Sequence, residues 1–148
     1  MRPLPHRYDV QLKGGPNGHA LLLSVGRPDL PTAPPREFGG PGDAWSPEHL
    51  LLASVESCFL FTFRAVARAA HIEFADVNVH AEGTVDHHAG VTKFTEILLR
   101  PRITVRRGTD REKLAYVIAK TEKSCLVSAS LATPVRIEAD IVENRAAA

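Results

Sequence analysis

The chain has 148 residues, which is enough for a single domain over residues 1–148 with one sizeable core. Its hydrophobic share of 44% and its charged share of 24% are those of an ordinary globular protein. The formal net charge of +1 gives no reason to expect nucleic acid, a membrane surface or an acidic substrate as a partner.

The N-terminal third of the chain predicts a hairpin and then a long loop. Tyr8, Val10 and Leu12 alternate with polar residues, the segment GGPNG favours a turn, and residues 19–25 return as a strand. Residues 26–45 are rich in proline and glycine and show no periodic apolar pattern, so we expect a connecting loop. Connections of this length in compact domains are usually functional or disordered.

A long helix is the clearest element of the sequence. Ser46 fits the N-cap, Pro47 fits the first helical position, and Glu48 is favoured in the first turn. The helix then continues without glycine or proline to about His71, and its apolar residues cover most of the circumference. We therefore expect a central helix that is covered by a sheet or by a partner subunit.

The remaining elements complete an α+β pattern. Residues 77–85 and 91–99 predict two strands joined by a turn at Gly90, and the second strand continues past Pro101 with a bend or an edge position there. Three further elements follow: a helix capped by Thr109, a short helical or turn segment over residues 125–131, and a closing strand over residues 135–142. The order ββ-α-ββ-α-β predicts an α+β fold with an antiparallel sheet.

Two features of the sequence bear on its compartment. The first ten residues contain no apolar stretch of signal-peptide length. The most apolar run carries Glu56, Arg64 and Arg68, so it is not expected to span a bilayer. We therefore expect a soluble, cytoplasmic protein.

The two cysteines are the candidate reactive groups. In a reducing compartment Cys58 and Cys125 are more often unpaired, metal-bound or catalytic than a structural disulfide, and the histidines lack ligand-like spacing to either. Cys58 lies about twelve residues into the helix, where the helix dipole has faded. A cation that activates it must come from outside the helix, and Arg27 and Arg36 of the loop are the candidates. Without one, Cys58 is an ordinary core cysteine.

Two stretches of the chain resemble the OsmC/Ohr family. Residues 38–72, FGGPGDAWSPEHLLLASVESCFLFTFRAVARAAHI, are similar to its core signature, in which a Pro-Glu pair opens the central helix and a cysteine follows ten residues after the glutamate. Here these residues are Pro47, Glu48 and Cys58. The segment KSCLVSASLATPVRIEADI around Cys125 resembles the second hallmark, a cysteine followed by small residues and a final strand. Many characterised members have proline directly after this second cysteine, where this chain has leucine.

The resemblance implies a sheet wrapped around the central helix and an intertwined homodimer with active sites at the subunit interface. It also implies an antioxidant two-cysteine hydroperoxide reductase, in which Cys58 attacks the peroxide and Cys125 resolves the sulfenic acid. An arginine held by Glu48 would stabilise the thiolate; Arg36 matches the loop position best and Arg27 is the fallback. An external dithiol would reopen the disulfide, within or between chains, and neither a metal nor another cofactor is needed.

The spacing on the helix predicts a composite site. Glu48 and Cys58 are about 15 Å apart along the axis of a straight helix, a distance that one carboxylate–arginine–thiolate chain spans only with difficulty. Two such helices packed antiparallel across a two-fold axis would bring Glu48 of one subunit near Cys58 of the other.

Two other functions remain open from the sequence. A hotdog-type thioesterase would use Glu48 or Glu56 as its base, and neither cysteine would matter. A non-catalytic OsmC-like protein would bind a small apolar ligand in its pocket. If the chain is a peroxidase, the apolar residues around Cys58 favour organic hydroperoxides over hydrogen peroxide.

Overall fold

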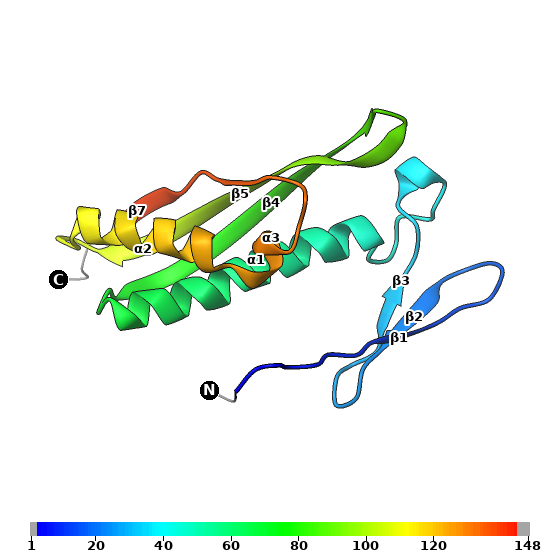
Figure 1. The fold of residues 1–148 in the computed structure, drawn as a ribbon, viewed down its shortest axis with the longest axis horizontal. Coiled ribbons are helices and arrows are strands. Elements are labelled where there is room, and N and C mark those ends of the chain that lie inside the picture. The colour runs from blue at the N-terminus through cyan, green and yellow to red at the C-terminus, as the bar shows by residue number, and fades with distance from the viewer. Residues whose placement is uncertain (1–2, 145–148) are drawn as a thin grey trace. The chain divides into compact units, whose positions relative to one another are not determined.

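The computed structural model describes residues 3–144 (Figure 1). The chain divides into two compact units, Met1–Leu51 and Leu52–Ala148. The single domain expected over residues 1–148 stays a prediction.

The N-terminal unit contains a small antiparallel sheet in the order β1-β2-β3. The predicted hairpin is confirmed, although its strands are shorter than expected. The prediction that residues 26–45 form only a loop is wrong, because a third strand and a short 3-10 helix lie there. Pro31 is compatible with this strand because β3 is at the edge of the sheet, where a missing N–H breaks no ladder. The elements are β1 (Gln11–Lys13), β2 (Ala20–Leu23), β3 (Leu30–Thr32) and η1 (Arg36–Phe38).

The helix α1 (Pro47–Ala69) confirms the predicted central helix. The hydroxyl of Ser46 accepts a hydrogen bond from the His49 N–H at 3.3 Å, and the Ser46 carbonyl accepts one from the Leu50 N–H at 2.9 Å. Ser46 is thus the N-cap, and Pro47 occupies the first helical position, where its missing N–H breaks no helical hydrogen bond.

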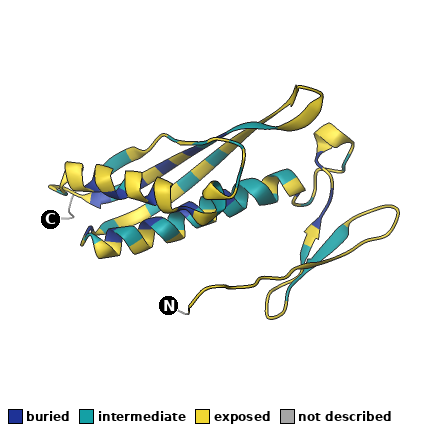
Figure 2. Ribbon diagram, in the orientation of Figure 1, coloured by how far each residue is buried: buried dark blue, intermediate teal, exposed yellow. Residues whose placement is uncertain are grey.

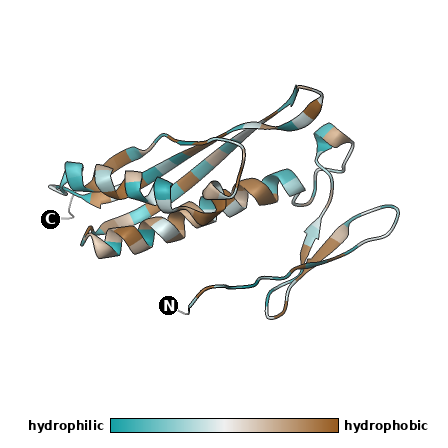
Figure 3. Ribbon diagram, in the orientation of Figure 1, coloured by the Kyte–Doolittle hydropathy of each residue, from teal (hydrophilic) through white to brown (hydrophobic). Residues whose placement is uncertain are grey.

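Within one chain, α1 buries only one stripe of its apolar surface. The buried side chains repeat every four residues, at Val55, Phe59, Phe63 and Ala67. Figure 3 shows apolar residues along the whole helix, whereas Figure 2 shows few of them buried, and Phe61 is 62% exposed. By length and hydropathy alone α1 could cross a membrane, a test that the core helix of a soluble protein also passes.

A long hairpin dominates the C-terminal unit. Its strands are β4 (Phe74–His88) and β5 (Val91–Arg106), which pair antiparallel and confirm the predicted pair. Ala89 and Gly90 join them, with φ angles of 50° and 80°. Positive φ at both positions is what a type I′ turn requires, and glycine supplies it without strain. Alternate residues of β5 are buried, namely Ile97, Leu99, Pro101, Ile103 and Val105.

The last third of the chain returns to the same sheet. The helix α2 (Arg111–Ser124) is capped by Asp110, whose side chain accepts a hydrogen bond from the Lys113 N–H, and not by Thr109 as predicted. The short helix α3 (Leu126–Ala129) confirms the helical segment expected there. The predicted single closing strand is two strands, β6 (Val135–Ile137) and β7 (Asp140–Asn144).

The expected antiparallel sheet is wrong for these closing strands, because β6 and β7 pair with β5 in parallel. Parallel neighbours need a crossover of a dozen or more residues, and residues 107–134 with both helices supply it. The sheet is therefore mixed, and the α+β class is confirmed.

Pro101 lies inside the sheet, so of the two alternatives expected there, a bend or an edge position, the edge position is wrong. On one side Pro101 pairs with Val79 of β4. On the other side β6 pairs only as far as Leu99 and β7 starts only at Arg102. Pro101 thus stands opposite the break between two short strands, where its missing N–H interrupts no ladder.

Candidate functional site: a pair of thiols

The structure brings Cys58 and Cys125 together within the C-terminal unit. Cys58 is half-buried on α1, and its sulfur accepts a hydrogen bond from the backbone N–H of Val127 at 3.5 Å. The hydroxyl of Thr62, one helical turn further on, lies 4.0 Å from the same sulfur. Because Val127 belongs to α3, the segment after Cys125 is held against the middle of α1.

Cys125 stands at the junction between α2 and α3. It is the C-cap of the first helix and the N-cap of the second, with extended backbone angles of φ −70° and ψ 108°. Its side chain is only 2% exposed, and the hydroxyl of Ser128 donates a hydrogen bond to its sulfur at 3.2 Å. Both cysteines are free thiols.

The surroundings of the two thiols move their pKa values in opposite directions. For Cys58, burial raises the pKa, but hydrogen bonds from the Cys125 thiol and from the Val127 N–H outweigh it, so the net pKa lies below the ordinary value. Weaker contributions in the same direction come from Thr62 and from the backbone of Leu126. Cys58 is therefore the better thiolate of the two.

For Cys125, burial is the largest cause and raises the pKa, and the hydrogen bond to Cys58 raises it further. Hydrogen bonds from the side chain and backbone of Ser128 oppose these effects without cancelling them. The pKa of Cys125 therefore lies above the ordinary value and that of Cys58 below it, so Cys58 ionises first.

The arginines proposed to activate Cys58 both lie in the N-terminal unit. Arg27 donates through Nη1 to the Ser24 hydroxyl at 3.3 Å and to the Val25 carbonyl at 2.9 Å, so it holds its own turn together. Arg36 packs directly on Gly42, where a Cβ would have no room. The activating role of either arginine stays a prediction.

Glu48 carries an unusual buried atom. Its Oε2 is shielded from solvent and has no hydrogen-bond partner within residues 3–144. A buried carboxylate oxygen is normally paired, and a guanidinium is a donor that fits it. Its proposed role in holding an arginine stays a prediction as well.

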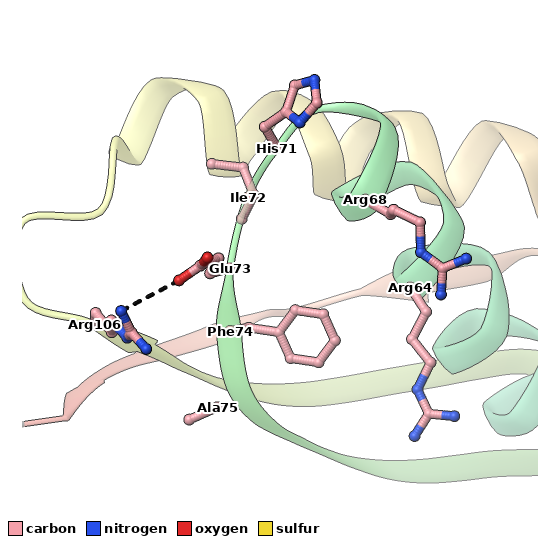
Figure 4. Close-up of a pocket in the computed structure, with 8 residues that line it drawn as sticks. All are labelled: Arg64, Arg68, His71, Ile72, Glu73, Phe74, Ala75 and Arg106. Atoms are coloured by element: carbon pink, nitrogen blue, oxygen red, sulfur yellow. Dashed lines mark ion pairs between the residues drawn. The ribbon is translucent and has the colours of Figure 1, made fainter.

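A separate cavity of about 720 Å³ lies at the end of α1 and contains neither cysteine (Figure 4). Arg64 and Arg68 from α1 project into it, and Arg106 forms an ion pair with Glu73 at 3.3 Å. The guanidinium of Arg64 also lies 5.5 Å from the centre of the Phe61 ring. Because neither cysteine lines this cavity, it is separate from the thiol site.

A second cavity, of about 370 Å³, reaches the thiol pair from the Cys125 side. Its lining includes Cys125 and Ser128 together with apolar side chains of α1, β5 and the closing segment. Within residues 3–144 no cluster of three or more His, Cys, Asp or Glu residues could hold a metal ion.

Sequence reasoning identified the two cysteines but missed the backbone donors that surround Cys58. The first N–H groups of a helix have no intrahelical partner, and a short helix was predicted to begin at Cys125. The free N–H groups after Cys125 were therefore a usable signal. The cavity beside Cys125 had no such signal, because its lining comes from segments far apart in the sequence.

Together, the fold and the site define an α+β protein in which a half-buried thiol with a lowered pKa lies beside a buried thiol with a raised pKa. Comparison with protein families gives this class a name. The family model described as OsmC-like protein matches residues 40–140, and the chain belongs to the OsmC family.

Known relatives agree with this assignment. The chain is 26% identical over 107 residues to YmaD of Bacillus subtilis, described as an uncharacterized protein; the match covers 70% of this chain and 71% of that one. An OsmC-like protein of Mycoplasma pneumoniae has the same fold, with a TM-score of 0.81, 17% identity and coverage of 95% and 100% of the two chains. An organic hydroperoxide resistance protein OsmC of Legionella pneumophila has a TM-score of 0.73, 27% identity and coverage of 93% and 99%.

Proposed function

We propose that this protein is a thiol-dependent peroxidase that reduces organic hydroperoxides as part of an oxidative-stress response. The observation that carries the proposal is the pairing of Cys58 and Cys125, with the pKa of the first lowered and that of the second raised. A peroxidase of this kind needs one thiolate to attack and one nearby thiol to resolve. The name of the Legionella relative points to the same substrate class.

The reaction begins with the Cys58 thiolate attacking one peroxide oxygen. The S–O bond forms as the O–O bond breaks, and the departing alkoxide takes up a proton to become an alcohol. Cys125 then attacks the sulfur of the sulfenic acid; the S–S bond forms, the S–O bond breaks, and water leaves. An external dithiol reduces the disulfide and is itself oxidised, so the reaction requires no metal or other cofactor.

The thiolate is proposed to receive further stabilisation from Arg36, held by Glu48. The unpaired buried oxygen of Glu48 supports this, since a guanidinium would satisfy it. Arg27 is the weaker candidate, because its guanidinium already makes two hydrogen bonds within its own turn.

The protein is proposed to act as a homodimer with its sites at the subunit interface. The exposed apolar surface of α1, including Phe61, supports this assembly. A helix that is apolar on most sides is stable in water only when a partner covers the remaining faces. Members of the OsmC family are soluble proteins. We propose that this protein is cytoplasmic and meets its dithiol reductant there. We propose neither a membrane nor a nucleic acid as a partner.

A non-catalytic function as a binder of small apolar ligands is the second candidate. The cavity of about 370 Å³ beside Cys125 favours it, because that volume suits a small ligand. Membership of the OsmC family leaves the hotdog-type thioesterase without support.

Thiol titration before and after one equivalent of cumene hydroperoxide separates the two candidates. A peroxidase loses both thiols of each chain, and a binding protein keeps both. Cys58→Ser is the matched control, since its remaining thiol at Cys125 should survive the same treatment. Unchanged thiols in the wild-type protein would overturn the proposed function.

A further inference from the structure

The cavity at the end of α1 lies where the arginines without a carboxylate partner gather. Residues 52–144 contain eight arginines. Five of them form ion pairs with Asp or Glu, namely Arg100, Arg102, Arg106, Arg111 and Arg136. The other three, Arg64, Arg68 and Arg107, have no such partner within residues 3–144. All three line either this cavity of about 720 Å³ or a neighbouring one of about 360 Å³.

The two cavities form one positively charged region of the C-terminal unit. The lining residues that they share are His71, Ile72, Glu73 and Arg106. Three arginines and one glutamate line the larger cavity, so its formal charge is +2 with the histidine neutral, whereas the whole chain carries only +1. The smaller cavity adds Arg107 and Lys113 against Asp110. An excess of positive charge in a concave site favours an anionic ligand.

Arg64 and Arg68 form the charged wall of the larger cavity. They are one helical turn apart on α1, so both side chains lie on one face of the helix (Figure 4). Like charges at this spacing repel each other, and a bound anion would offset the repulsion. The helix dipole favours a cation in the last turn and so accounts for Arg68, but Arg64 lies before that turn.

The same cavity also has an apolar wall. Figure 4 shows the ring of Phe74 directed toward Arg64 and Arg68. Phe63 packs against this ring with the two ring centres 5.1 Å apart, which fixes its position. A cavity of this volume accommodates a small molecule, and an aromatic or apolar part of that molecule could lie on Phe74 while its anionic group meets the arginines.

His71 has a backbone conformation that glycine adopts more easily. Its φ is 53°, in the left-handed region. Its N–H donates to the Arg68 carbonyl at 3.1 Å, and the Ile72 N–H donates to the Ala67 carbonyl at 2.9 Å. This pattern ends many helices, usually with glycine at the left-handed position. Histidine costs conformational energy there, but it brings an imidazole to the lining of both cavities, where a ring N–H can donate to an anion.

We propose that this cavity binds a small molecule that carries a phosphate group on an aromatic or apolar body. A phosphate monoester carries about two negative charges at neutral pH, which match the charge of the lining, whereas a carboxylate carries one. Its three terminal oxygens can accept hydrogen bonds from both free guanidinium groups and from His71 together. Because neither cysteine lines the cavity, binding there does not depend on the peroxidase activity.

An NMR titration of the ¹⁵N-labelled full chain tests the ligand class. The probes are phenyl phosphate, inorganic phosphate and benzoate, at low salt so that charges are least screened. Phenyl phosphate should bind about tenfold more tightly than inorganic phosphate, which lacks the ring, and than benzoate, which lacks the second charge. The amide shifts should concentrate at residues 64–75 and 106–107. Equal affinities for the three probes, or shifts centred elsewhere, would overturn the proposal.

Substitution of the charged wall tests the residues. Arg64→Gln and Arg68→Gln should each weaken phenyl phosphate binding by about tenfold, the loss expected for one charge-assisted hydrogen bond. Arg102→Gln is the matched control: it removes the same charge from an exposed arginine that lines neither cavity, and should change the affinity by less than about twofold. An equal loss in all three variants would mean that only net charge matters, which contradicts a built site.

Two further variants separate binding from folding. Arg64→Lys keeps the charge but loses the planar fork, so its affinity should fall between those of Arg64→Gln and the wild type. His71→Gly relieves the left-handed strain and should not lower the unfolding temperature, yet it should weaken phenyl phosphate binding by about threefold. Full affinity in His71→Gly would remove the imidazole from the site.

A carboxylate of a second copy of the chain is the competing occupant, because the exposed surface of α1 is proposed to be covered in a homodimer. Sedimentation velocity of Arg64→Gln and Arg68→Gln distinguishes the two. Unchanged assembly together with weakened phenyl phosphate binding supports the small-molecule site. Dissociation of a wild-type dimer by either variant would assign these arginines to the subunit interface and overturn the proposal.

Discussion

One cysteine lies in the middle of α1 and the other at the junction between α2 and α3. The two surroundings give the same kind of side chain different pKa values. The sulfur on α1 is half-buried and accepts a hydrogen bond from the Val127 N–H, whereas the sulfur at the junction is sealed from solvent and accepts one from the Ser128 hydroxyl. Burial and the hydrogen-bond donors around each sulfur move the two pKa values in opposite directions. Neutral backbone and thiol donors lower the pKa of Cys58 even before any cation is considered.

The largest effects are expected when one of the two sulfurs is removed at a time. Cys58→Ser should lower peroxide turnover by about a thousandfold or more, because the attacking atom is gone. Cys125→Ser should still react once per chain, at a rate near that of the wild type, and then stop. Stopped-flow kinetics with cumene hydroperoxide measures the first turnover of each variant.

Mass spectrometry supplies the control for these two variants. Cys125→Ser should accumulate added oxygen on Cys58, since no thiol is left to resolve the sulfenic acid. Equal first-turnover rates in both variants would mean that the roles of the two cysteines have been assigned wrongly.

The pH dependence of alkylation sharpens the comparison further. Cys58 should react with iodoacetamide with a midpoint below 9.0 and lose reactivity as the pH falls through that midpoint, because only the thiolate reacts. Cys125 should have its midpoint above 9.0. Peptide-resolved alkylation between pH 5 and pH 11 measures both.

Because the two thiols interact, replacing one should shift the alkylation midpoint of the other in a known direction. Cys125→Ala removes the S–H donor and should move the Cys58 midpoint upward, whereas Cys125→Ser keeps a hydroxyl and should move it less. Cys58→Ala removes the neighbouring thiolate and should move the Cys125 midpoint downward. Midpoints that stay fixed in all three variants would contradict the hydrogen bond between the sulfurs.

The smallest expected effect concerns the backbone next to Cys125. Leu126→Pro removes one N–H that helps to lower the pKa of Cys58. The side chain is 70% exposed and stands at the first position of α3, where proline is tolerated. Alkylation of Cys58 at neutral pH should slow by about twofold to tenfold, the effect of one hydrogen bond.

Leu126→Ala keeps the N–H and is the matched control for this change. If both variants react equally fast with iodoacetamide, the Leu126 backbone contributes nothing to the thiolate.

Local patterns in the sequence were sufficient to predict α1 and the β4–β5 hairpin. The cap at Ser46, the proline after it and the turn at Gly90 all act through neighbouring residues. The same holds for the helical start after Cys125. These elements depend on interactions of short range, which a sequence displays directly.

The parts that the sequence did not predict depend on contacts between distant segments. Nothing near Val135 indicates that it pairs in parallel with Ile97, and nothing near Pro101 shows the break that accommodates it. The same limit applies to the site. Both cysteines could be selected from the sequence, but the contact of Cys58 with the backbone of Val127 joins residues 69 positions apart.

The junction that holds Cys125 has a mechanical consequence. Cys125 closes α2 and opens α3: its N–H donates to the Glu122 carbonyl at 3.5 Å, and its own carbonyl accepts from the Ala129 N–H at 3.0 Å, so its backbone is held from both sides. The sulfur is therefore free to turn only about the bonds of its own side chain. Closing and reopening a bond to its neighbour then requires only a local rotation, which leaves the scaffold undisturbed through repeated cycles.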